Sequence, residues 1–232
     1  ARKCPTLEIF VRKEIHKLYY NYLLFDLDHT LLDFDAAEEV ALTRLLEESG
    51  VKDVQTYKNF YIPMNKQMWE DLTLKRISKK ELVSTRFSRL FAHFDQEVDG
   101  REYADFYQEL LSQQGQILAG ADDLLVNLSQ QGYHIFGATN GITRIQEGRM
   151  AHSGIETFFE HVFISDKIGF QKPDTSFYTH IAQNISNFDR KKALMIGDSL
   201  IADVQGGNNA GIDTVWYNPE TKTNTTKALP TY

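Results

Sequence analysis

A short apolar run that ends in two aspartates constrains the fold of this chain more than any other feature. Residues 22–25 read as a buried strand, which is followed at once by Asp26, Asp28 and Thr30. Burying two carboxylates at a strand end costs free energy unless a cation or a reaction uses them. The carboxyl ends of strands in open α/β sheets are also where ligands bind. A solvated acidic turn is the plain alternative, because such short motifs are common.

Four more strand-like runs follow, at 134–138, 161–165, 193–196 and 213–217. Each run is short, apolar and rich in β-branched or aromatic residues, and helical stretches separate them. This alternation predicts βαβ units and a parallel sheet. Gly132, Gly154 and Gly211 each precede a strand, as glycines that end helices do. We therefore expect an α/β fold with a Rossmann-like, doubly wound parallel sheet.

The segment between the first two strands contains no convincing strand and reads as helical. Four helices are predicted in it, at 36–49, 57–72, 81–94 and 103–111. Ser78 stands three residues before Glu81, and Asp99 stands three before Glu102, which is the spacing of an N-terminal capping box. An all-helical insertion of four helices is therefore expected directly after the first strand.

These boundaries predict two domains and an extension. The helical insertion spans 34–118, and the α/β core is made of 21–33 and 119–232. Residues 1–20 read as an appended N-terminal extension, in which no targeting signal is recognised. The polar stretch after residue 218 is expected to be a truncated or disordered C-terminus.

Composition excludes several classes of partner. The chain carries 25 Lys and Arg against 32 Asp and Glu, a net charge of −7, which argues against binding to nucleic-acid polymers or anionic membranes. No run of about 18 apolar residues is present, so no membrane span is predicted. The single cysteine, Cys4, excludes an internal disulfide and fits a reducing, cytoplasmic setting. We expect a small-molecule partner, and a monomer or homodimer.

Polar residues also follow the ends of the second and third strands. Thr139, Asn140 and Gly141 stand at a strand-to-helix turn, where backbone N–H groups suit an anionic oxygen. An ordinary helix cap with its glycine is the alternative. Lys172 precedes a proline that can open the next helix, which pins the lysine near a helix start. Taken alone, Lys172 would be assigned to the solvated surface.

The fourth strand adds a third strand-end carboxylate. Asp198 follows this strand directly, and Asp203 comes five residues later. Together with Asp26 and Asp28, Asp198 is expected to form an oxygen-rich cluster that suits a hard cation, and Mg²⁺ is the expected ion.

Taken in chain order, these groups resemble the four motifs of the haloacid dehalogenase (HAD) superfamily. The resemblance covers residues 22–218, and the helical insertion looks like that superfamily's first type of cap. It implies a Mg²⁺-dependent phosphomonoester hydrolase that forms an aspartyl-phosphate intermediate. The acid at Asp28 favours phosphoester chemistry, since the dehalogenase branch usually lacks it.

The resemblance implies a role for each motif. Asp26 would attack phosphorus, and Asp26, Asp198 and the backbone carbonyl of Asp28 would bind Mg²⁺, which offsets the repulsion between anions. The Asp28 side chain would protonate the leaving oxygen and then activate water. Thr30 and Asp203 would support the site, with Asp203 holding Lys172 or metal-bound waters.

The phosphoryl oxygens would be bound by the remaining motif residues. The resemblance assigns this role to Thr139, the backbone around Asn140, and Lys172, as charge redistributes in the reaction.

The stretch 60–87 is similar to the cap of bacterial pyrimidine 5′-nucleotidases. Asn65 stands four residues before Trp69, and Arg86 with Phe87 follows at the matching place. The resemblance implies a pyrimidine nucleoside monophosphate, with an aromatic ring stacked on the base and an amide or guanidinium at its edge. Aromatic residues at helical spacing also suit the core of a four-helix cap. The alternative for Trp69 is therefore that it packs in the core of the cap.

Three other functions stay open. They are a phosphatase of small sugar phosphates, a phosphomutase on the same scaffold, and a non-catalytic binding protein. A phosphomutase would call for a further cluster of phosphate-binding cations in the insertion, and none is recognised. Because every motif position is filled, the binding protein is disfavoured.

Overall fold

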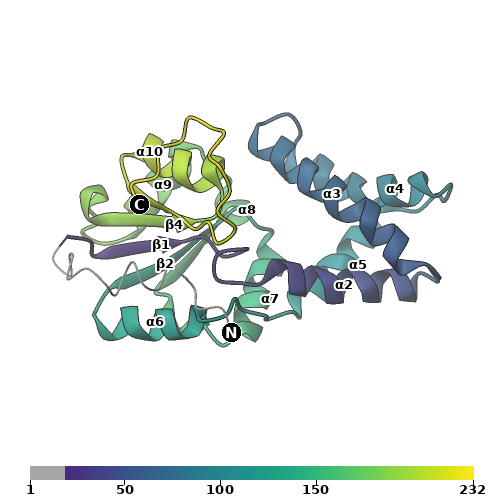
Figure 1. The fold of residues 1–232 in the computed structure, drawn as a ribbon, viewed down its shortest axis with the longest axis horizontal. Helices are drawn as coiled ribbons and strands as arrows, with labels where there is room; N and C mark the ends of the chain where they lie inside the picture. Colours follow the sequence, from purple (N-terminus) through teal and green to yellow (C-terminus); the bar gives the residue numbers. More distant parts are fainter. Residues whose placement is uncertain (1–18) are drawn as a thin grey trace.

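The computed structural model describes residues 19–232 and is built around a parallel five-stranded sheet (Figure 1). The strands are β1 (Tyr22–Phe25), β2 (His134–Thr139), β3 (His161–Ile164), β4 (Ala193–Gly197) and β5 (Asp213–Trp216). Their order in the sheet is β3-β2-β1-β4-β5, and every neighbouring pair is parallel. The central strand β1 therefore ends beside the ends of β2 and β4. The predicted α/β class and all five strands are confirmed.

Helices cover both faces of this sheet (Figure 1). One face packs against α6 (Ala121–Gln130) and α7 (Thr143–Ser153), and the other packs against α9 (Thr175–Asn184) and α10 (Gly206–Ala210). Side chains of β1 alternate between the two: Leu23 and Phe25 join the first layer, while Leu24 joins the second. Each fully buried side chain of this kind contributes roughly 1.5–3 kcal/mol of transfer free energy. Hydrophobic burial on both faces thus fixes the strand that carries the two aspartates.

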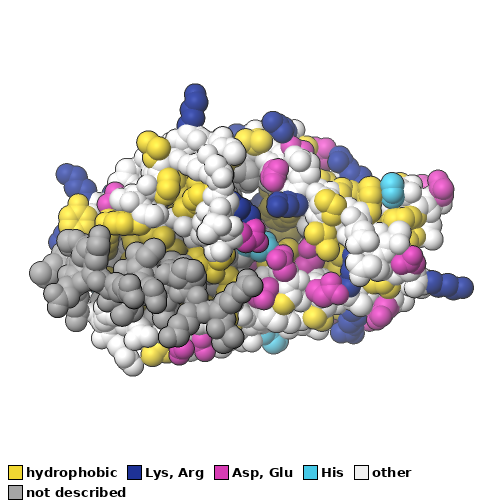
Figure 2. All heavy atoms as spheres, viewed as in Figure 1, with side chains coloured by type: hydrophobic (Ala, Val, Ile, Leu, Met, Phe, Trp, Pro, Cys, Tyr) yellow, Lys and Arg dark blue, Asp and Glu magenta, His cyan; other side chains and the backbone are white. Residues whose placement is uncertain are grey.

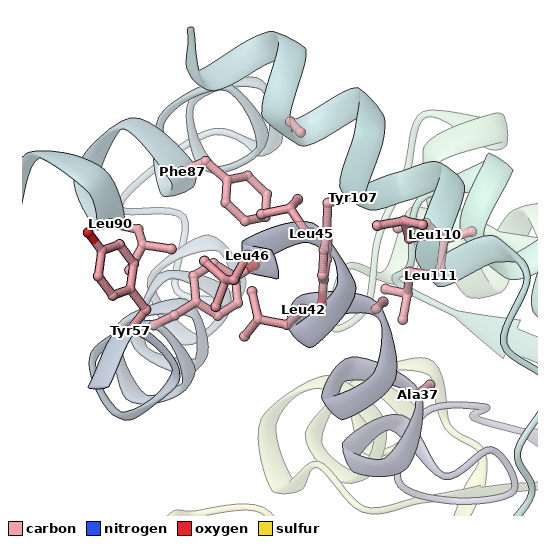
Figure 3. Packing of buried hydrophobic residues seen from close by; sticks show 14 of the residues in the cluster. Ala37, Leu42, Leu45, Leu46, Tyr57, Phe87, Leu90, Tyr107, Leu110 and Leu111 are labelled. Atoms are coloured by element: carbon pink, nitrogen blue, oxygen red, sulfur yellow. The ribbon is translucent and has the colours of Figure 1, made fainter. Parts of the chain in front are cut away.

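Four helices form a second lobe after β1. They are α2 (Phe34–Glu48), α3 (Val54–Thr73), α4 (Lys79–His93) and α5 (Gly100–Ser112). As predicted, the Ser78 side chain accepts from Glu81 N at the start of α4, and Asp99 accepts from Glu102 N at the start of α5. The apolar faces of all four helices meet in one cluster, part of which Figure 3 shows. We call this lobe, residues 34–112, the cap.

Two chain segments connect the cap to the sheet and pair with each other. Asp33 N donates to Gln116 O at 2.9 Å, and Leu118 N donates to Leu31 O at 2.9 Å. Leu32 and Ile117 form an antiparallel bridge between these hydrogen bonds. Residues 31–33 and 114–118 are therefore called the two linkers. The domain limits at 34 and 118 stay a prediction.

The remaining elements are short. They are η1 (Glu156–Phe158), α8 (Ser165–Ile168), η2 (Arg190–Lys192) and the π-helical turn η3 (Leu200–Gln205). Among residues 19–232, no helix is both long enough and apolar enough to cross a membrane. The predicted extension at 1–20 lies almost entirely outside the described residues.

Of the two alternatives expected for the C-terminal stretch, truncated or disordered, the structure contradicts the disordered one. The chain after β5 forms no further helix or strand, yet its last residues return to that strand. Thr231 N donates to Thr214 O at 2.9 Å, and Trp216 N donates to Tyr232 O at 3.2 Å. Because β5 is an edge strand, its outer backbone groups need partners, and the tail supplies them.

Candidate active site

Three carboxylates meet where β1 and β4 end. Asp26 follows β1, Asp198 follows β4, and Asp203 lies in the π-helical turn η3. One oxygen atom of each lies within 4.8 Å of the others. Asp26 and Asp203 are buried, so their negative charges are poorly screened by water. The sheet topology has thus brought together residues that are far apart in the sequence.

Lys172 supplies a positive charge inside this group. Its ammonium nitrogen lies 2.6 Å from Asp26 Oδ1 and 2.6 Å from Asp203 Oδ1, and the side chain is 1% exposed. Burial alone would lower the pKa of Lys172, but the carboxylates of Asp203 and Asp26 outweigh it and raise that pKa. The lysine is therefore held as a buried cation, and the alternative of a solvated surface residue is excluded.

One lysine does not balance three acidic side chains. Burial, together with the nearby carboxylates of Asp203 and Asp28, raises the pKa of Asp26 to about 7 despite Lys172. Burial and the charge of Asp26 raise the pKa of Asp198 to about 6. Both shifts arise first from burial, which disfavours the charged carboxylates, and second from the repulsion between neighbouring carboxylates. A divalent cation between these oxygens would offset that repulsion, so the donor set fits a hard metal ion.

Some carboxylate oxygens of the site already accept hydrogen bonds from the protein and are therefore poor candidates for metal ligands. Asp203 uses Oδ1 for Lys172 and Oδ2 for the backbone N–H of Ser199, at 3.0 Å. A Cβ on Gly197 would overlap this carboxylate, so a glycine is required there. Asp26 Oδ2 has only Thr30 Oγ1, at 3.5 Å. This geometry leaves Asp203 in a supporting position and leaves Asp26 Oδ2 as the oxygen best placed to bind a metal.

Thr139 and Asn140 lie beside this group, at the end of β2. Thr139 Oγ1 accepts from Gly141 N at 3.1 Å and from Gln146 Nε2 at 3.0 Å. The Asn140 side chain exchanges two hydrogen bonds of 2.8 Å with the backbone N–H and C=O of Lys172. The Asn140 amide therefore ties two loops together, and only its backbone is left to meet a ligand.

Asp28 points to a different set of partners. Its Oδ2 accepts from Gln146 Nε2 at 2.6 Å, and its Oδ1 forms an ion pair with Arg149 Nη1. Both partners belong to α7 and are fully buried. Sequence reasoning missed them, because polar residues on a helix next to apolar ones are ordinarily assigned to its solvated side. Their three-residue spacing, which puts both on one face, was the available signal.

Comparisons with known proteins test the resemblance to the HAD superfamily. A family model described as haloacid dehalogenase-like hydrolase matches residues 23–217, nearly the whole of the described chain. The chain belongs to this family. The resemblance stated from the sequence motifs is therefore confirmed, and the protein is a HAD-like hydrolase.

Individual proteins of this family are similar to the chain over most of its length. The chain is 62% identical over 215 residues to pyrimidine 5′-nucleotidase PynA of Streptococcus pneumoniae, covering 93% of this chain and 91% of that protein. It is 27% identical over 213 residues to pyrimidine 5′-nucleotidase YjjG of Escherichia coli, covering 92% of each. A solved structure of the putative HAD-hydrolase YfnB from Bacillus subtilis, bound to magnesium, superposes with a TM-score of 0.88 at 38% identity. That match covers 92% of this chain and 93% of the YfnB chain.

The cap of this HAD-like hydrolase also contacts the site directly. Lys79, the first residue of α4, donates to Asn140 O at 3.0 Å and to Ser165 Oγ at 2.9 Å. Burial lowers the pKa of this lysine. Figure 2 shows a hollow between the two lobes, with basic, acidic and histidine side chains around it. Sequence reasoning missed the Lys79 contact, because nothing local distinguishes this lysine from the others in the chain.

The cap residues singled out in the sequence divide into two kinds. Asn65 and Arg86 are buried in a polar cluster, in which Asn65 Nδ2 and Tyr107 OH donate to Glu38 Oε1 at 3.2 and 3.1 Å. Trp69 is half-buried and packs against the apolar clusters of the cap, as the cap-core alternative expects. The structure thus brings Asn65 and Arg86 together and leaves Trp69 apart from them.

Proposed function

We propose that this chain is a Mg²⁺-dependent phosphomonoesterase that hydrolyses pyrimidine nucleoside 5′-monophosphates. The observation that carries the proposal is the contact between Asp26 and the buried ammonium of Lys172, with Asp198 beside them. A carboxylate held against a buried cation, next to free metal-ligating oxygens, suits attack on an anionic phosphate. The 62% identity to a pyrimidine 5′-nucleotidase supports the substrate class.

The metal is proposed to be Mg²⁺, bound by Asp26, Asp198 and the backbone carbonyl of Asp28. When bound, it would supply the charge that lets a carboxylate and a phosphate approach each other. The acidic cluster and the magnesium in the related YfnB structure both support this assignment.

The chain's own residues then carry two displacements. An Asp26 oxygen attacks phosphorus, the bond from phosphorus to the nucleoside oxygen breaks, and Asp28 gives that oxygen a proton. In the second step water attacks the aspartyl-phosphate and transfers its proton to Asp28, while the bond between phosphorus and Asp26 breaks. Lys172, Thr139 and the backbone N–H groups after β2 bind the phosphoryl oxygens throughout.

The polar cluster of the cap supports recognition of a base. Among residues 19–232, four of its buried atoms have no partner at hydrogen-bond distance: Tyr61 OH, Asn65 Oδ1, Arg86 Nε and Arg86 Nη2, although the Tyr61 hydroxyl still interacts more weakly with Tyr107 and Arg86. Leaving each such group unpaired costs about 1–3 kcal/mol, so a ligand that pairs with them gains affinity. An amide oxygen and guanidinium donors complement the N–H and carbonyl groups on a pyrimidine edge. Glu38, which accepts from Asn65, lies on α2, the first helix after the loop that carries Asp28.

The test is phosphate release from a panel of nucleotides and sugar phosphates, with Mg²⁺ or with chelator. Wild-type protein should release phosphate mainly from pyrimidine monophosphates, and only with the metal present. Asp26→Asn should reduce that rate by about 10³-fold or more, since the nucleophile is lost. Release mainly from sugar phosphates would keep the mechanism and overturn the substrate class. No release from any phosphate, with the protein folded, would favour the mutase or the binding protein.

Two further assignments belong to this proposal. The acidic net charge and single cysteine support a cytoplasmic enzyme, and a monomer or homodimer is expected. Sedimentation equilibrium would decide between the two oligomeric states.

A further inference from the structure

Arg149 joins the acid–base carboxylate to both linkers of the cap. Its side chain is fully buried, and each of its three nitrogen atoms donates a hydrogen bond. Nη1 donates to Asp28 Oδ1, Nε donates to Gln114 O at 3.4 Å, and Nη2 donates to Asp33 O at 3.3 Å. The guanidinium also lies over the ring of Phe34, 5.5 Å from its centre. One core residue therefore contacts the first linker, the second linker and Asp28 at once.

Gln146, one helical turn before Arg149, binds the other oxygen of the Asp28 carboxylate. Both N–H groups of its amide are used at the site, one on Asp28 Oδ2 at 2.6 Å and one on Thr139 Oγ1 at 3.0 Å. The other end of the same amide, Gln146 Oε1, is buried and has no hydrogen-bond partner in the part of the chain that the structure describes. The two N–H groups of the amide, and not its oxygen, therefore set its orientation. This orientation places a donor on each of the two motif side chains.

We propose that Arg149 is a positioning residue for proton transfer by Asp28, with Gln146 assisting it. The inference rests on the proposed function, since it concerns the acid–base step. A free aspartate samples several χ1 rotamers, whereas a proton donor must lie within about 2.6–3.2 Å of the atom it serves. Donors on both carboxylate oxygens fix one rotamer. Because the same guanidinium binds both linkers, the placement of Asp28 is coupled to the placement of the cap.

The leaving group of the substrate separates this role from a merely structural one. Departure of a nucleoside alkoxide needs a proton from Asp28, whereas p-nitrophenolate departs without one. The ratio kcat/KM reports the steps up to loss of the leaving group, so it isolates this first proton transfer. Misplacing Asp28 should therefore affect the two esters unequally, while general damage to the fold should affect them alike.

The experiment measures kcat/KM for uridine 5′-monophosphate and p-nitrophenyl phosphate in wild type, Arg149→Lys, Gln146→Met and Asp28→Asn. Lysine keeps the charge of Arg149 but cannot reach three acceptors, and methionine keeps the length of Gln146 without its donors. All three variants should lose about 30-fold or more with the nucleotide and less than about threefold with the nitrophenyl ester. Gln146→Met carries the test by itself if Arg149→Lys does not fold.

A double variant and a control complete the design. Asp28→Asn combined with Arg149→Lys should be no worse than Asp28→Asn alone, since both changes remove the same proton transfer. Arg144→Lys, on the same helix but exposed and paired with Glu109 at 3.4 Å, should keep wild-type rates. Equal losses with both esters, additive losses, or unchanged rates in Arg149→Lys and Gln146→Met would overturn this inference alone. A wild-type enzyme inactive on both esters would overturn the proposed function and this inference with it.

Discussion

The side-chain amide of Asn140 and the backbone of Lys172 exchange two hydrogen bonds of 2.8 Å, across 32 residues of sequence. The carbonyl oxygen of the amide accepts from Lys172 N, and its NH₂ group donates to Lys172 O. The loop after β2 is thereby attached to the loop that carries the buried lysine. The ammonium that lies against Asp26 owes its position to this attachment as well as to its own ion pairs.

The first prediction concerns this attachment. Asn140→Leu removes both hydrogen bonds and leaves two backbone groups of Lys172 without these partners, which should lower the free energy of unfolding by about 1–3 kcal/mol. Urea denaturation measures that loss. Phosphate release should fall too, because the ammonium is then held by its ion pairs alone. Asn127→Leu is the control: its amide donates only to a carbonyl within an exposed helix turn, so a change within about 0.5 kcal/mol is expected. Equal stability of the two variants would contradict the prediction.

The second prediction concerns the buried ion group. Lys172→Met removes the cation between Asp26 and Asp203 and should destabilise the metal-free protein by about 3–5 kcal/mol, because buried carboxylates are left uncompensated. The double variant Lys172→Met/Asp203→Asn should recover part of this loss. Denaturation in urea with chelator present measures both. The exposed ion pair of Lys167 with Glu147 provides the control Lys167→Met, for which a change of about 0–1 kcal/mol is expected. A double variant no more stable than the single one would count against the charge argument.

The third prediction concerns metal binding and pH. The pKa values of Asp26 and Asp198, raised to about 7 and about 6, mean that the metal-free site holds protons near neutral pH. A metal needs both groups ionised, so Mg²⁺ should displace these protons and bind more tightly as pH rises from about 5.5 to about 7.5. Isothermal titration calorimetry in two buffers of different ionisation enthalpy measures the protons released. An affinity that stays flat over this interval would contradict the prediction.

The fourth prediction concerns Glu38 in the cap. Burial raises the pKa of this carboxyl above its ordinary value of 4.5, although Tyr107 and Arg86 oppose the shift. A raised pKa means that the folded state binds the proton more tightly than the unfolded chain does. Its contribution to stability is therefore complete below about pH 4.5 and is lost as pH rises through the folded-state pKa.

The neutral analogue Glu38→Gln tests this sign. It should be more stable than wild type at neutral pH, and the difference should shrink toward the ordinary pKa of 4.5. Thermal unfolding at several pH values measures the difference. Glu47→Gln, on the exposed side of the same helix, should show almost none. A Glu38→Gln protein less stable than wild type at pH 7 would mean that the carboxylate charge is needed, for example by Arg86.

Local patterns in the sequence were sufficient for the elements and for the motif positions. Short apolar runs set the five strands, and the side chains of Ser78 and Asp99 set where two cap helices begin. These features depend on neighbours within a few residues, so a linear reading captures them. The order of the motifs and their places at strand ends also predicted that Asp26, Lys172 and Asp198 would converge, since parallel strands share one carboxyl edge.

Tertiary structure alone decided which partners these residues have. Arg149 reaches Asp28 across 121 residues, and Lys79 reaches Asn140 across 61. Contacts of this range depend on how α7 packs under the sheet and how the cap sits on the core. A sequence does not distinguish a buried arginine from an exposed one. The two differ in solvent exposure and in the hydrogen-bond acceptors around the guanidinium, and the folded chain alone determines both.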